Sequence, residues 1–146
     1  MMPLTFSQAG MELVFSGAML FQIGLVQGML IPKFKNSRMA LSAHLSAVQS
    51  GMALMIFGII WNLIELPSPW LGLTETALIL SVYLIWLGIT VSAVTGASKV
   101  LPIAGEGYAG SRASEQIVGV IEGMGVLLSV TSGAAILLSL ALSLLV

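Results

Sequence analysis

The side chain best suited to chemistry is a lone histidine, His44, within the segment NSRMALSAHLSAVQSGMALMIFGIIW. It lies three residues after Leu41, where a long apolar run begins. The chain has no cysteine, which excludes thiolate ligands and cysteine nucleophiles. A zinc site built only from protein side chains needs more donors than one histidine supplies. If His44 binds a metal, the other ligands must come from a cofactor. Haem fits best, because the porphyrin contributes four nitrogens and one axial imidazole suffices.

Helical spacing places His44 on a stripe where the side chains become small. At about 100° per residue, Gly51 lies two turns beyond the histidine and nearly in line with it. Gly58 continues the gap, so the stripe has room for something flat and Gly51 is predicted to bind the cofactor. Two simpler interpretations share this spacing. His44 packs against a neighbouring helix, or its ring reaches the headgroups or caps a neighbouring carbonyl.

Other polar residues inside apolar runs are the remaining candidates, because a carboxylate near a membrane helix centre costs about 2.5–3.5 kcal/mol. Glu122 lies deep in the last run, and Glu115 lies seven residues before it on the same helical face. No catalytic triad, P-loop, HExxH motif or dinucleotide fingerprint is present. The further polar candidates within or beside the runs are Gln22, Gln27, Ser42, Ser46, Ser50, Asn62, Glu65, Tyr83, Thr90 and Gln116.

The elements that must position these residues are membrane helices. The chain is 58% hydrophobic and 8% charged, whereas soluble domains are about 25% charged. Four runs reach the roughly 20 apolar residues that a spanning helix needs, and the period-2 alternation of a membrane barrel is absent. We therefore predict an all-α, integral membrane four-helix bundle that forms a single domain over residues 1–146. The predicted spans are about 11–31, 41–66, 70–97 and 116–146.

Basic residues predict the orientation of these spans. All five lie in the first and third loops, at Lys33, Lys35, Arg38, Lys99 and Arg112. By the positive-inside rule, loops 32–40 and 98–115 face the cytoplasm and both termini lie outside. We expect a multi-pass protein of a bacterial-type inner membrane, in contact with the lipid bilayer. The net charge of −1, without a charge run, indicates no nucleic-acid partner.

The segment around His44 resembles the first loop and second helix of hydroxylaminobenzene mutases, whose pattern is close to N-P-R-M-G-L-S-S-H-L-E-G-V-x-N-G. The third loop, LPIAGEGYAGSRASE, resembles the P-I-A-G-x-G-x-x-G run of the same family. The resemblance extends over essentially the whole chain. A more distant resemblance is to styrene oxide isomerases, which share a glycine seven residues after the histidine.

The resemblance implies an isomerase that converts an aryl hydroxylamine, such as hydroxylaminobenzene, to an aminophenol in the degradation of aromatic compounds. Styrene oxide isomerases are trimers of four-helix protomers with haem b near the protomer interface. On that basis we expect a homo-oligomer, a trimer, in which His44 binds the iron and Arg38 pairs with a haem propionate. Haem iron would act as a Lewis acid on a small lipophilic aromatic substrate that enters from lipid.

Three further residues receive expected roles from this comparison. Ser50 replaces the family's asparagine and is expected to orient the polar head of the substrate, while Tyr83 and Trp86 are candidate walls for its ring. Ile89 stands where the epoxide isomerases have a tyrosine, which favours the hydroxylamine substrate. An alternative is a small oligomeric transporter or proton-conducting bundle without haem, using Glu122 together with Glu65 and Gln27. Another is an assembly subunit without chemistry.

Overall fold

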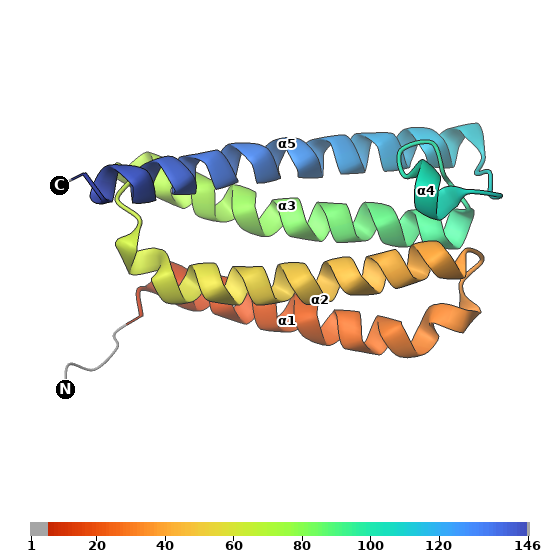
Figure 1. The fold of residues 1–146 in the computed structure, drawn as a ribbon, viewed down its shortest axis with the longest axis horizontal. Coiled ribbons are helices and arrows are strands. Elements are labelled where there is room, and N and C mark those ends of the chain that lie inside the picture. Colours follow the sequence, from red (N-terminus) through yellow and green to blue (C-terminus); the bar gives the residue numbers. More distant parts are fainter. Residues whose placement is uncertain (1–5, 146) are drawn as a thin grey trace.

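The computed structural model describes residues 6–145 as a bundle of four long helices, without a strand among these residues (Figure 1). Each long helix is long and apolar enough to cross a membrane. The predicted all-α transmembrane bundle is therefore confirmed. The elements are α1 (Gln8–Leu30), η1 (Ile31–Lys33), α2 (Ser37–Ile60), η2 (Trp61–Leu63), α3 (Ser68–Thr95), α4 (Pro102–Gly105) and α5 (Arg112–Ser143).

Two of the helices start about four residues before the predicted position. Helix α2 begins at Ser37 and α5 at Arg112, rather than at about 41 and 116. Each has an N-cap side chain, since the Asn36 Oδ1 atom accepts the Met39 N–H at 3.0 Å and the Ser111 Oγ atom accepts the Ser114 N–H at 3.1 Å. Such caps satisfy free N–H groups of a first turn. They extend each helix into polar sequence that an apolar window excludes.

Glycines bring α1 and α2 into backbone contact. A Cβ atom added to Gly17 would lie 2.5 Å from the Gly51 carbonyl oxygen, and one added to Gly10 would lie 2.7 Å from the Gly58 carbonyl oxygen. Further along the pair, a Cβ atom on Gly24 would lie 2.9 Å from a neighbouring side chain of α2. Small residues permit this close approach of membrane helices. The two helices therefore form one tightly packed antiparallel hairpin.

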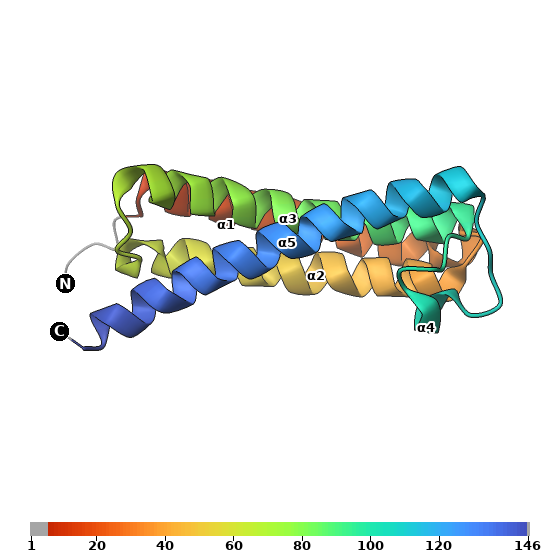
Figure 2. The same cartoon turned by 90° about the horizontal axis from the view of Figure 1, so that it is seen from above.

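A second hairpin, formed by α3 and α5, lies against the first through α2 and α3, and seen from above α5 runs obliquely to the other helices (Figure 2). The described chain begins and ends at the same end of the bundle, and α4 lies at the opposite end beside the loop between α1 and α2 (Figure 1). Both basic loops therefore share one end of the molecule, as the sequence predicts. We call this the loop end.

At the loop end, a buried asparagine joins three elements. Asn36 is 0% exposed, and its N–H donates to the Ala93 carbonyl of α3 at 3.0 Å. Its Nδ2 atom donates to the Ala104 carbonyl of α4, also at 3.0 Å. Below it, Met39, Ala40 and Ala43 pack against Ile89 and Ala93 of α3. These contacts fix the first turns of α2, the part of the helix that carries His44.

Candidate active site

His44 lies in the second turn of α2, and its half-buried ring points at α1. Its Nδ1 atom is 2.7 Å from the Gly24 carbonyl oxygen. One turn further along α1, Gly28 makes room for the ring, because a Cβ atom there would lie 2.9 Å from both Cε1 and Nδ1. Gly24 and Gly28 thus seat the imidazole between the two helices, in the arrangement of the simpler interpretation, in which His44 packs against a neighbouring helix and bonds its carbonyl.

The hydrogen bond defines which histidine nitrogen is free. A carbonyl oxygen only accepts, so Nδ1 carries the proton and Nε2 of the neutral ring keeps its lone pair. A backbone carbonyl on the second nitrogen is a common way to orient a metal-binding histidine. The described residues contain no group of three or more His, Cys, Asp or Glu side chains that could hold a metal ion. His44 therefore fits a metal that brings its own ligands, as haem does.

Gly51 has a different environment from the one predicted. The column of small residues beside His44 was expected to receive a flat cofactor. In the structure α1 fills it, since a Cβ atom on Gly51 would lie 2.7 Å from the Phe21 nitrogen and 2.9 Å from the Phe21 Cβ atom. The periodicity correctly identified a stripe that faces a neighbour, but the neighbour is a helix. We therefore leave Gly51 out of the cofactor site.

Ser50 and Tyr83 do not converge on His44 within one chain. Six residues separate Ser50 from His44, so at 100° per residue they lie about 120° apart around α2. The Tyr83 hydroxyl donates to the Ser16 carbonyl of α1 at 2.9 Å. That carbonyl is eight residues, about 12 Å, along α1 from the His44 partner Gly24. The two predicted substrate residues thus occupy separate places in the bundle.

Arg38 is engaged by the third loop. Its guanidinium Nη1 atom lies 3.9 Å from the Glu106 carboxylate, and its Nη2 atom donates to the Glu106 carbonyl. Both side chains are largely exposed, at 57% and 82%, so the ion pair itself adds about 0–1 kcal/mol. The expected propionate partner is therefore paired with a carboxylate of the protein itself. The pair lies in solvent, from which another carboxylate can compete for the guanidinium.

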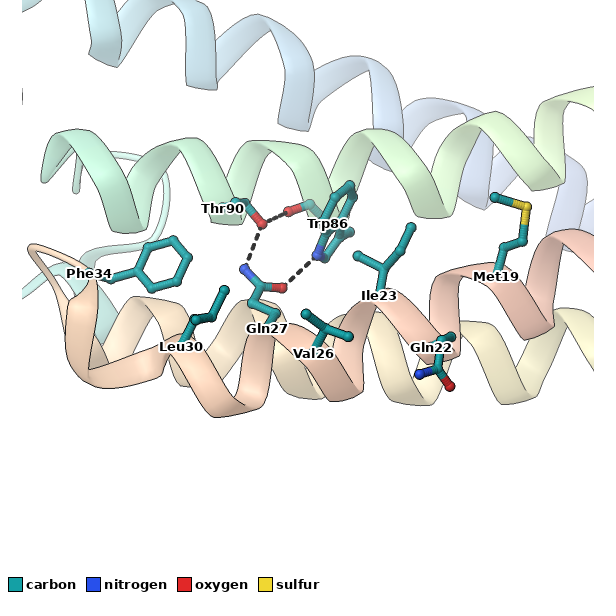
Figure 3. Close-up of a pocket in the computed structure, with 9 residues that line it drawn as sticks. All are labelled: Met19, Gln22, Ile23, Val26, Gln27, Leu30, Phe34, Trp86 and Thr90. Carbon is teal, nitrogen blue, oxygen red and sulfur yellow. Dashed lines mark hydrogen bonds between the residues drawn. The ribbon is translucent and has the colours of Figure 1, made fainter.

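A groove of about 450 Å³ lies between α1 and α3 (Figure 3). Exposed apolar side chains of α1 form its outer wall, so the groove opens on the apolar outer surface of the bundle. Small-molecule sites are typically apolar hollows with a few polar groups that fix orientation. The residues that line it are Met19, Gln22, Ile23, Val26, Gln27, Leu30, Phe34, Trp86 and Thr90.

A short hydrogen-bond chain forms the polar part of this groove (Figure 3). The Trp86 Nε1–H donates to the Gln27 Oε1 atom at 2.7 Å, and the Gln27 Nε2–H donates to the Thr90 Oγ1 atom at 3.1 Å. Thr90 in turn donates to the Trp86 carbonyl at 2.8 Å. Gln27 is only 5% exposed. These hydrogen bonds hold the indole ring at the groove wall, where the ring can contact an aromatic ligand.

Two polar residues of the loop end, Glu115 and Asn36, had no predicted role. The Glu115 carboxylate accepts N–H groups of Ser98, Lys99 and Gly110 at 3.0 to 3.2 Å, and so anchors both ends of the third loop. Asn36 ties α4 to α2, as described above. A side chain with N-cap chemistry directly before Ser37 was the available signal for Asn36. The Glu115 contacts span up to 17 residues and have no sequence signature.

These features define a helical membrane protein with an apolar surface groove and a histidine whose Nε2 atom has no hydrogen-bond partner among the described residues. Comparison with known proteins identifies a family. Residues 10–141 match the styrene oxide isomerase family, and the chain belongs to this family. It is 39% identical to hydroxylaminobenzene mutase HabA of Ectopseudomonas oleovorans over 104 residues, which cover 70% of this chain and 77% of HabA.

A second relative supports the same assignment. Hydroxylaminobenzene mutase HabB of the same organism is 32% identical over 120 residues, which cover 80% of this chain and 71% of HabB. No solved structure matches the chain. The chain is an isomerase of the mutase type, as its resemblance to this group implied.

Proposed function

We propose that the protein converts a small aryl hydroxylamine to an aminophenol inside the membrane. In this isomerisation the N–O bond breaks, a ring C–O bond forms, and a ring hydrogen is replaced by one on nitrogen. No net oxidation occurs. The names of the two relatives support this substrate class. The observation that carries the proposal is the His44 ring, whose Nδ1 atom is bonded to Gly24 and whose Nε2 atom is free to bind a cofactor metal.

We propose haem b as that cofactor. His44 would hold it through Nε2, and Arg38 would pair with a propionate in place of Glu106. When bound, haem iron supplies a Lewis acid suited to polarising an N–O bond. The chain contributes the orientation of the imidazole, which the Gly24 carbonyl and the space above Gly28 fix.

The groove between α1 and α3 is the proposed docking place for the aromatic substrate. An aryl hydroxylamine partitions into lipid, from which it can reach a groove on the apolar outer surface of the protomer. The Trp86 indole offers a flat wall, while Gln27 and Thr90 offer hydrogen bonds to a polar head. Tyr83 lies about one turn before Trp86 on α3 and remains a candidate wall residue, with its hydroxyl already bonded to α1. The apolar lining keeps water from the reacting bond.

We propose that a site using both His44 and the groove combines two copies of the chain. On α1, the groove residues Val26 and Leu30 each lie two positions, or about 200°, from Gly24 and Gly28, which contact His44. Helix α1 therefore separates the groove from the histidine within one protomer. We propose a homo-oligomer, a trimer by family resemblance, in which the groove of one protomer serves the His44 site of its neighbour.

Product analysis with mixed oligomers tests both parts of the proposal. Membranes containing the wild-type chain should convert hydroxylaminobenzene to an aminophenol, and His44→Ala and Gln27→Leu should each abolish or strongly reduce conversion. Co-expression of the two variants should restore part of the activity, because some interfaces then combine an intact His44 with an intact groove. No aminophenol from wild-type membranes supplied with haem would refute the activity. Inactive mixtures of two folded, co-assembled variants would refute the shared site alone.

A further inference from the structure

A buried carboxyl group outside the proposed active site has no partner. Glu122 of α5 is 4% exposed, and its Oε1 atom makes no hydrogen bond with any described residue. Its side chain rests on Gly88 of α3, where an added Cβ atom would lie 2.9 Å from the Glu122 Cδ atom. Glu115, seven residues earlier on the same helix, is by contrast fully bonded to loop N–H groups. Glu122 is thus separate from the loop anchor.

A second unpartnered group lies on the facing helix. Ser92 of α3 is 1% exposed, and its Oγ atom also has no hydrogen-bond partner among the described residues. It lies one turn beyond Gly88, about 40° around the helix, and so on the same face. Serines in helices usually bond the carbonyl one turn back, as Ser132 does at 2.7 Å. Ser92 departs from that pattern.

The antiparallel register brings these two groups toward each other. Gly88 faces Glu122, and Gly125 faces Ile85, since a Cβ atom on Gly125 would lie 3.1 Å from the Ile85 nitrogen. Moving toward the C-terminus of α3 therefore means moving toward the N-terminus of α5. Side chains on a helix lean toward its own N-terminus. The Glu122 carboxyl thus leans from Gly88 in the direction of Ser92.

An unpaired buried polar group costs about 1–3 kcal/mol, and several kcal/mol in the bilayer core. Both groups escape this cost if one molecule that donates and accepts hydrogen bonds lies between them. Water bridges buried polar groups in this way, and the carboxyl itself fills the space above Gly88. We propose that the seam between α3 and α5 contains a buried water-binding site whose protein ligands are the Glu122 carboxyl and the Ser92 hydroxyl.

Radiolytic hydroxyl-radical labelling of the intact protein in lipid nanodiscs tests this site. Radicals formed from a bound water modify the side chains beside it, even when these are buried. We expect the Glu122 side chain, relative to its intrinsic reactivity, to be labelled several-fold more than the buried side chains of Leu20 and Leu54, which serve as internal references. Labelling of Glu122 no greater than that of the two leucines would overturn the proposal, whatever the isomerase activity.

Variants identify the ligands of the water. Glu122→Leu should reduce labelling at residue 122 to that of the reference leucines. Ser92→Ala should lower the labelling of Glu122. Glu122→Gln should retain the labelling at residue 122, because the amide still bonds water. Gly88→Ala should displace the carboxyl and lower the signal, whereas Gly123→Ala is the matched control, with no atom within 4 Å of the added Cβ. If Glu122→Leu fails to fold, Ser92→Ala decides. Labelling that both folded variants leave unchanged would contradict the assigned ligands.

Discussion

Gly28→Ala should displace the His44 ring without removing any polar group. The added Cβ atom would lie 2.9 Å from Cε1 and Nδ1, whereas ordinary contacts begin near 3.4 Å. The ring must therefore retreat by about half an ångström or more, which weakens the 2.7 Å hydrogen bond to Gly24. Overpacking typically costs about 1–3 kcal/mol, and the hydrogen bond contributes about 0.5–1.5 kcal/mol. We expect Gly28→Ala to lower the free energy of unfolding by about 2 kcal/mol.

The assay is denaturant unfolding in mixed micelles, followed by far-ultraviolet circular dichroism, with haem content measured on the same samples. Gly123→Ala is the matched control, because its Cβ atom meets no atom within 4 Å. This variant should unfold at the same denaturant concentration as the wild type or a slightly higher one, since alanine favours a helix by about 1 kcal/mol over glycine. Gly28→Ala should also bind less haem. If the two alanine variants were indistinguishable in stability and haem content, the account of how His44 is seated would be refuted.

Asn36→Ala should lower the free energy of unfolding by about 2–4 kcal/mol in the same assay, because the cap of α2 and the buried bond to α4 are both lost. Asn36→Asp keeps the oxygen that caps α2, so its free energy of unfolding should lie between those of the wild type and Asn36→Ala. Equal losses in both variants would contradict this division between the cap and the buried bond. Glu115→Ala should speed tryptic cleavage after Lys99 several-fold with little change in helix content, and an unchanged cleavage rate would show that the carboxylate does not anchor the loop. Since the chain lacks cysteine, Ile103→Cys and Ser143→Cys can report topology: an impermeant maleimide added outside cells should label only the second, and the reverse pattern would invert the proposed orientation.

The membrane class and the helices followed from composition, because apolar runs of this length have no other stable arrangement in lipid. Helix starts were less accurate, since Asn36 and Ser111 extend helices into polar sequence through caps that an apolar window ignores. The placement of both basic loops at one end followed from the alternating direction of the spans.

The site was only partly predictable. The stripe that contains His44 and Gly51 was predicted to leave room for a flat cofactor, with a neighbouring helix as the alternative. Periodicity within one helix does not identify what packs there, and α1 occupies the space near Gly51. The groove depends on Gln27 of α1 meeting Trp86 and Thr90 of α3. That meeting depends on the rotation of two helices about their axes, which no local pattern encodes.

The visible absorption spectrum of the detergent-purified protein, produced with ample haem, tests the central claim most directly. The free Nε2 atom of His44 predicts a Soret band in the wild type that is lost or greatly weakened in His44→Ala, while Ser42→Ala, on the same helix, retains it. The folded state of each variant is checked by circular dichroism. A colourless wild-type protein, or a Soret band unchanged in folded His44→Ala, would contradict the proposal that this histidine binds haem iron.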